Sequence, residues 1–150
     1  MNSPQPIAEP SEPAGLPRRL VALGYDLLLI TALLFLFTLV LVMARDARGS
    51  GPPGTHWLQL AAFAISAVFF CYFWTHGGQT SGMRAWRIRV VREDGGPVGW
   101  GSALLRFVAA WLSALPLGLG YWWSLFDPQR RCWHDKLSHT AVIFEPKPRG

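Results

Sequence analysis

Two long apolar runs dominate the hydrophobic pattern of the chain. Residues 20–43 contain a single charged side chain, Asp26, and residues 57–74 contain none. At about 1.5 Å of rise per helical residue, these runs reach roughly 36 Å and 27 Å, and the hydrocarbon core of a bilayer is about 30 Å thick. The pattern therefore predicts two full transmembrane helices. Trp57 and Trp74 lie at the ends of the second run, where aromatic rings prefer the membrane interface.

The first run tolerates an acidic residue. An aspartate in the middle of a transmembrane helix costs about 2.5–3.5 kcal/mol on the insertion scale, whereas each Leu, Ile, Val or Phe contributes roughly −0.3 to −0.6 kcal/mol. Many such residues surround Asp26, so insertion remains favourable. The carboxylate still needs hydration, a partner or a proton, and this makes Asp26 a candidate functional residue.

A third apolar stretch, residues 102–126, is interrupted. Arg106 lies in its first turns, and Pro116, Gly118 and Gly120 break its middle. The stretch is either one kinked span or a re-entrant hairpin that returns to the side it left. Twenty-five residues are too few for two complete spans.

Basic residues favour the hairpin. Two predicted spans separate the N-terminal arginines from the 76–101 loop, so these segments share a side. That side carries six basic residues, the opposite 44–56 loop carries two, and the segment after Phe126 carries five. A hairpin gives eleven basic residues on one side and two on the other, whereas a single span gives six and seven. The positive-inside rule therefore favours a hairpin and a cytoplasmic N-terminus.

Short strands are expected between and after these runs. Arginines alternate with Trp86, Ile88 and Val90 across residues 84–92, a period of two that indicates a strand, with an amphipathic helix as the alternative. Residues 140–144 form a second β-branched strand, which could pair with residues 88–91 on the cytoplasmic side. The predicted fold is an all-α membrane protein with two full transmembrane helices, a Pro/Gly-broken third and short surface strands.

Three segments organise the chain. Residues 1–17 contain five prolines and are expected to be a disordered tail, residues 18–145 form the membrane domain, and residues 146–150 form a flexible tail.

Composition and charge narrow the possible functions. Apolar residues make up 51% of the chain and charged residues 15%, and the net charge is +5. This basicity fits contact with anionic lipid head groups, and no recognition element for nucleic acid accompanies it. His134, Asp135 and His139 lack a further ligand at metal-binding spacing, so no metal is expected. We expect no cofactor, and no nucleophile–base pattern indicates an enzyme.

Three motifs together resemble the RDD family of membrane proteins. They are RRLVALGYD at residues 18–26, GQTSGMRAWRIRVVREDGGPV at 78–98 and LFDPQRRCWHDKLSHTAVI at 125–143. The resemblance maps the family's arginine onto Arg19, with Arg18 as a substitute, and its two aspartates onto Asp26 and Asp135. It implies a multi-pass inner-membrane protein that moves a cation or proton, or alternatively a scaffold or accessory subunit of a membrane complex.

The spacing of the charged residues adds geometry to this resemblance. Arg19 and Asp26 are seven residues apart, so they share a helix face but lie about 10 Å apart along the axis. Each is expected to reach another segment, with Asp135 approaching Arg19 or Arg106. Gln79 and His134, within the motifs, are candidate supporting residues. The charges either form a static network or serve an ion pathway, and a pathway through so few helices requires a homo-oligomer or a membrane-protein partner.

Overall fold

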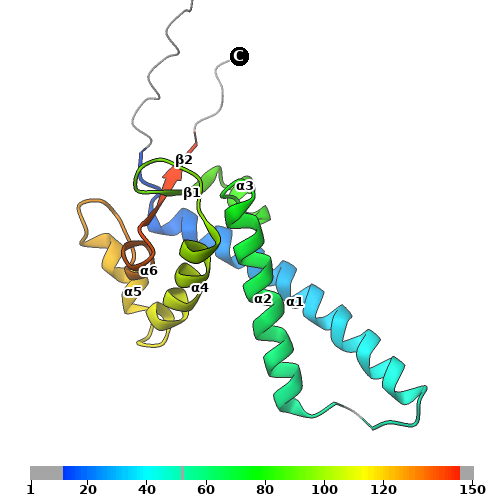
Figure 1. The fold of residues 1–150 in the computed structure, drawn as a ribbon. Coiled ribbons are helices and arrows are strands. Elements are labelled where there is room, and N and C mark those ends of the chain that lie inside the picture. The colour runs from blue at the N-terminus through cyan, green and yellow to red at the C-terminus, as the bar shows by residue number, and fades with distance from the viewer. Residues whose placement is uncertain (1–11, 52, 146–150) are drawn as a thin grey trace, which may run out of the picture.

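The computed structural model describes residues 12–51 and 53–145 of the chain. Its longest helices are α1 (Leu16–Asp46) and α2 (Thr55–Thr75), and both are long and apolar enough to cross a membrane. Both run away from the end that carries the strands and are connected at the opposite end (Figure 1). The two predicted spans are confirmed. Helix α1 begins earlier than its apolar run because Pro17 fits the first turn of a helix.

One stripe of α1 packs against the rest of the molecule. The buried residues of this helix recur every three or four positions in its first half: Leu16, Arg19, Ala22, Asp26 and Ile30. Its other large apolar side chains are mostly exposed, and Leu28 and Phe35 are 71% and 70% exposed. A bilayer would solvate this exposed surface with hydrocarbon, so the polar positions Arg19 and Asp26 mark the side that faces protein.

The two predicted strands form an antiparallel pair. Strand β1 (Ile88–Arg92) pairs with β2 (Thr140–Phe144), with Val90 opposite Val142. The bounds of the second strand and the pairing are confirmed. The first strand starts later than the alternation of arginines suggested, because Ser81–Ala85 form the short helix α3. The segment is therefore helical over Ser81–Ala85 and a strand over Ile88–Arg92, so each of the two alternatives describes a part of it.

The two strands belong to a repeated structural unit. Helix α6 (Trp133–Leu137) precedes β2 as α3 precedes β1, and each unit turns from helix to strand at a residue with a left-handed backbone, Arg87 (φ 52°) or His139 (φ 51°). These two residues are 52 positions apart, as are Val90 and Val142, the pair at the centre of the ladder. The sheet thus has a local two-fold relation between two helix–strand units.

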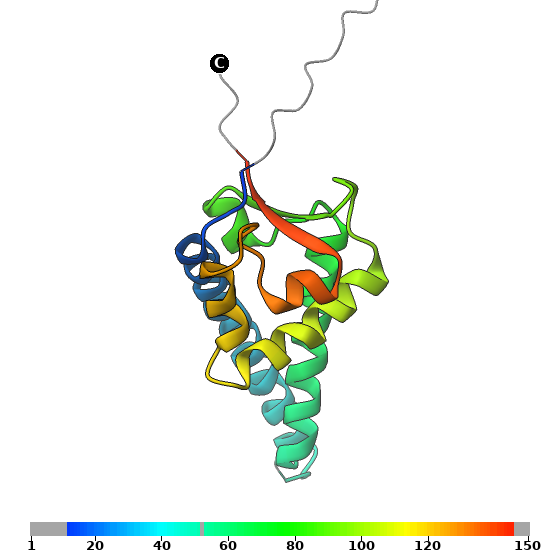
Figure 2. The same cartoon turned by 90° about the vertical axis from the view of Figure 1, so that its left-hand side faces the viewer.

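The third apolar stretch forms a hairpin. Helix α4 (Trp100–Ala114) is followed by α5 (Leu119–Trp122) and the 3-10 turn η1 (Trp123–Leu125), at a bend of 106°. Strand β1 precedes this segment and β2 follows it, so it begins and ends on the same side. Along the length of the molecule, its turn lies level with a middle part of α2 and does not reach the far end of that helix (Figure 2). This arrangement supports the returning alternative over a single kinked span.

The residues before α1 extend the sheet. The Ala14 N–H donates to the Val142 carbonyl at 2.9 Å, and Pro13 forms a bridge with Ile143. We expected disorder through residue 17, whereas residues 12–15 lie against β2 and α1 starts at Leu16. The remainder of that predicted tail, residues 1–11, and the predicted tail 146–150 lie outside the described residues.

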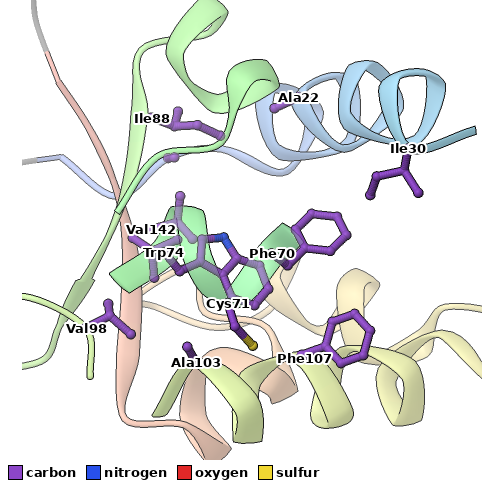
Figure 3. Close-up of a cluster of buried hydrophobic side chains, with 12 residues drawn as sticks. Ala22, Ile30, Phe70, Cys71, Trp74, Ile88, Val98, Ala103, Phe107 and Val142 are labelled. Carbon is purple, nitrogen blue, oxygen red and sulfur yellow. The ribbon is translucent and has the colours of Figure 1, made fainter. Parts of the chain in front are cut away.

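The buried apolar cluster lies where the long helices meet the sheet. Figure 3 shows Phe70 and Trp74 of α2 between Phe107 of α4, Ile30 of α1 and the strand residue Val142. Aromatic contacts connect α2 to α4, with the Phe70 and Phe107 ring centroids 6.1 Å apart. This cluster fixes α4 against α2 and so positions Arg106, the residue directly before Phe107.

Cysteine labelling can test the hairpin in membranes. The natural cysteines are both buried and should not react with a membrane-impermeant maleimide. Cysteines placed at the exposed positions Asp94 and Gln129 should label from one side, expected to be cytoplasmic, and a cysteine at exposed Arg48 from the other. Labelling of Gln129→Cys from the same side as Arg48→Cys would mean that residues 100–125 cross the membrane.

Candidate functional site

Two arginines share one buried carboxylate at the sheet end of the molecule. Arg19 Nη1 donates to Asp135 Oδ2 and Arg106 Nη1 donates to Asp135 Oδ1, each at 2.5 Å. The Cys132 N–H also donates to Oδ2, at 2.9 Å. Asp135 is 0% exposed. Its position at the start of α6 joins this helix to α1 and α4 at once, and both predicted partners of Asp135 are used.

The arginines have further partners that fix them in place. Arg19 Nε donates to the Ala14 carbonyl at 3.0 Å, and Arg106 Nη1 donates to Thr140 Oγ1 at 2.7 Å. Burial raises the pKa of Asp135, but the charges of Arg106 and Arg19 and the Cys132 N–H outweigh burial and hold the pKa below its usual value. The carboxylate is therefore ionised and fully engaged.

His134 lies beside this cluster as a neutral ring. Its Nε2 is 3.5 Å from Asp135 Oδ1, and the side chain is 7% exposed. Burial, together with the positive charges of Arg106 and Arg19, lowers the pKa of His134 to about 3 against the opposing effect of Asp135. With a neutral histidine, the buried group of Arg19, Arg106 and Asp135 carries one excess positive charge.

Asp26 belongs to a second, separate cluster. Its Oδ1 accepts from the Gly82 N–H at 2.8 Å, and its Oδ2 accepts from the Thr80 hydroxyl. Thr80 also caps α3, because its Oγ1 accepts from the Met83 N–H at 3.2 Å. Asp26 is 1% exposed and forms no ion pair within residues 12–51 and 53–145. Neutral donors from Thr80 and from α3 therefore hold this carboxylate, and none of the described arginines pairs with it.

The other candidate residues lie at the edges of these clusters. Gln79 Nε2 donates to the Ile88 carbonyl at 3.1 Å and to Glu145 Oε2 at 2.9 Å, which places Gln79 at the edge of the sheet. Arg18 is exposed, with its guanidinium carbon 4.2 Å from the centre of the Phe144 ring. Of the two adjacent arginines, Arg19 is therefore the one that forms a buried ion pair.

Sequence reasoning missed Thr80 and Gly82. Both stand in the TSGM segment of the second motif, and a Thr that precedes a short helix is a recognised capping signal. Gly82 is required by close approach: a Cβ there would overlap the Ala22 carbonyl oxygen and lie 3.0 Å from Asp26 Cγ. The glycine thus lets α3 lie directly on α1.

A cavity of about 330 Å³ borders both clusters. Arg19, Asp26, Arg106 and His134 lie along its wall, and most of the remaining lining is apolar and comes from α1, α2 and α4. The two clusters are thus distinct in their hydrogen bonds but open onto one shared space.

Cys132, His134 and Asp135 also come close enough to suggest a metal. Their candidate ligand atoms lie within 4.8 Å of one another. Arg19 and Arg106 already occupy both oxygens of Asp135, so a cation bound there would be repelled by two adjacent guanidinium groups. His139, the other histidine considered, lies outside this group and points to Glu93 at 3.6 Å.

Comparison with known proteins identifies the family. Searches among curated proteins and among solved structures gave no match. The sequence model of the RDD family matches residues 13–139, which include Arg19, Asp26 and Asp135. Because this match covers most of the chain, the protein belongs to the RDD family of membrane proteins.

Proposed function

We propose that this RDD protein moves a cation or a proton across the membrane by exchange at Asp26. The observation that carries the proposal is the position of this carboxylate: it is buried in a helix able to span the membrane, it is held by neutral donors, and it borders a cavity. A carboxylate without an arginine partner can bind and release a proton or a monovalent cation without breaking an ion pair.

The two aspartates have different roles in this proposal. Asp135 is bound by two guanidinium groups and a backbone N–H, so a change in its charge would leave two arginines uncompensated. Asp135 therefore holds the helices and the sheet together, and Asp26 is the exchanging group. Thr80 Oγ1 offers an oxygen next to Asp26, as a sodium ion prefers.

A complete pathway requires more than one chain. Two spans and one hairpin cannot enclose a route across the bilayer, so we propose a homo-oligomer or a membrane-protein partner around the exposed faces of α1 and α2. Anionic head groups would surround the basic side of the assembly.

Reconstitution can test the exchange. Proteoliposomes that contain the wild-type protein and an internal pH dye should show a pH change driven by a sodium gradient, and Asp26→Asn should reduce its rate at least tenfold, because an amide neither binds a proton nor balances a cation. Ser66→Ala, which removes another polar side chain on the cavity wall, is the matched control and should retain flux. Undiminished flux in Asp26→Asn would exclude Asp26 as the carrier.

A membrane scaffold is the second candidate. The rigid Arg19–Asp135–Arg106 network favours it, since such a network suits a fixed surface for a partner subunit. Here the wild-type protein should show no cation-driven flux, Asp26→Asn should lower only thermal stability, and a defined partner should co-purify in mild detergent.

A further inference from the structure

The segment between α2 and β1 forms an arch over α1. Its two ends are fixed to the sheet: the Val90 N–H donates to the Gly78 carbonyl at 2.8 Å, and the chain enters β1 at Ile88. Gln79 secures the first end further, because its Nε2 donates to the Ile88 carbonyl at 3.1 Å. Residues 80–87, which include α3, lie between these ends, and we call them the α3 arch.

Two hydrogen bonds to one carboxylate hold the α3 arch on α1. The Gly82 N–H donates to Asp26 Oδ1 at 2.8 Å, and the Thr80 hydroxyl donates to Asp26 Oδ2. Gly82 also lies directly on the backbone of Ala22, and Figure 3 shows α3 next to this residue. In the described part of the chain, no other hydrogen bond and no ion pair joins the arch to α1. The state of Asp26 therefore decides how firmly the arch is held.

The charge of Asp26 determines the strength of these two hydrogen bonds. The titratable groups that border the same cavity from other positions are Arg19, Arg106, Tyr121, Cys132 and His134. Both arginines pair with Asp135, and Arg84, on the arch itself, is exposed. The donors of the arch therefore bind a carboxylate that forms no ion pair among the described residues. A hydrogen bond to an ionised acceptor is roughly twice as strong as one between neutral groups, so a proton or cation on Asp26 weakens both bonds.

The arch also separates Asp26 from the surface at the sheet end. Asp26 is 1% exposed, whereas Ser81 and Arg84, on the outer side of α3, are exposed polar residues. One short helix therefore lies between the carboxylate and that surface. On its other side, Asp26 borders the cavity among α1, α2 and α4. Movement of the arch would open the carboxylate toward the sheet end without any change in the ion pairs of Asp135.

Little else holds the arch in its place. Met83 packs against the buried apolar cluster, whereas Trp86 is 37% exposed. The backbone turns sharply at both ends of the arch, at Gly78 (φ 72°) shortly before it and at Arg87 (φ 52°), its last residue. In lid motions, a few residues at the ends of an element absorb the backbone change. The arch can thus pivot about these turns while β1 stays paired with β2.

We propose that α3 is a gate at the sheet end of the molecule and that a proton or cation bound at Asp26 releases it. With an ionised, empty Asp26, the arch is closed and the carboxylate opens only onto the cavity. With Asp26 loaded, both hydrogen bonds weaken, the arch lifts, and the proton or cation leaves toward the sheet end. The inference rests on the exchange at Asp26 proposed above and adds how access to that site is regulated.

Amide hydrogen exchange of the full-length protein in nanodiscs tests the gate. Asp26→Asn imitates the neutral carboxyl group, so at one fixed pH the Gly82 amide should exchange about tenfold faster than in the wild type. The amides of α6 and β2 should keep their wild-type rates. Asp94→Asn is the matched control: Asp94 Oδ1 also accepts a backbone N–H, from Gly96 at 2.9 Å, but it lies at an exposed turn. This control should leave the Gly82 rate unchanged.

Cysteine labelling distinguishes movement of the arch from loss of a single hydrogen bond. Met83→Cys places a thiol on the inner side of α3, beside the cavity. A membrane-impermeant maleimide should label this thiol at least tenfold faster when Asp26→Asn is also present. Trp86→Cys, at an exposed position of the arch, is the control and should be labelled equally fast with and without Asp26→Asn.

Unchanged exchange at Gly82, or unchanged labelling of Met83→Cys, in the presence of Asp26→Asn would overturn the gate. Equal acceleration of exchange in α3, α6 and β2 would do so too, because the substitution would then loosen the whole sheet end. The flux measurement fails independently: a wild type without cation-driven flux, together with faster Gly82 exchange in Asp26→Asn, would reject exchange at Asp26 but retain its control of α3.

Discussion

Asp135→Asn should destabilise the protein by about 3–5 kcal/mol, the cost of removing one partner from a buried ion pair. The amide keeps the shape of the side chain but no longer balances Arg19 and Arg106, which are 8% and 3% exposed. Two guanidinium groups would then lie close together without a counter-charge. Unfolding in detergent, followed by tryptophan fluorescence against denaturant concentration, measures the change.

The control for this substitution is Asp94→Asn. Asp94 also pairs with an arginine, Arg92 at 2.8 Å, but its side chain is 59% exposed. Water replaces an exposed ion pair at little cost, so we expect a much smaller loss of stability than in Asp135→Asn. Equal effects of the two substitutions would show that the buried cluster does not hold the helices together, contrary to the role given to Asp135.

Gly82→Ala should be the second severe substitution. The added methyl group would overlap the Ala22 carbonyl oxygen and press on the carboxylate of Asp26, which accepts the Gly82 N–H. Relief of this overlap requires α3 to move away from α1, at a cost of about 1–3 kcal/mol for overpacking and roughly 1–3 kcal/mol more if the buried carboxylate loses a donor. The same unfolding measurement should detect it.

Gly101→Ala provides the comparison. Gly101 lies in α4, and a Cβ there would meet nothing within 4 Å. Alanine stabilises a helix by roughly 0.5–1 kcal/mol relative to glycine, so this variant should be as stable as the wild type or more so. If Gly82→Ala were equally harmless, the close approach of α3 and α1 would not be a requirement of the fold.

The features that the sequence predicted best are those that depend on the residues of one continuous segment. The spans follow from the length of two apolar runs, and strand β2 follows from five consecutive residues, Thr140–Phe144. Its pairing with β1 followed from the hairpin, which the distribution of basic residues favoured. The same reasoning placed Asp135 near Arg19 and Arg106.

The features that sequence did not predict depend on contacts between distant segments. Thr80 and Gly82 reach Asp26 across more than 50 residues, and both look like ordinary loop residues until α3 is placed on α1. The separation of Asp26 from the arginine cluster could likewise not be predicted. Spacing along α1 shows that Arg19 and Asp26 share a helix face, but it does not show which residues of other segments contact that face.

The large separation in sequence between Arg19 and Asp135 has a consequence for biosynthesis. The two residues are separated by 116 positions, so at translation rates of about 5–20 residues per second Arg19 leaves the ribosome roughly 6–23 s before its counter-ion exists. During that interval the nascent chain holds an unbalanced guanidinium at the membrane and an open edge on β1. Assembly must therefore finish after synthesis of β2, and chaperones or proteases that inspect the membrane surface have those seconds in which to act.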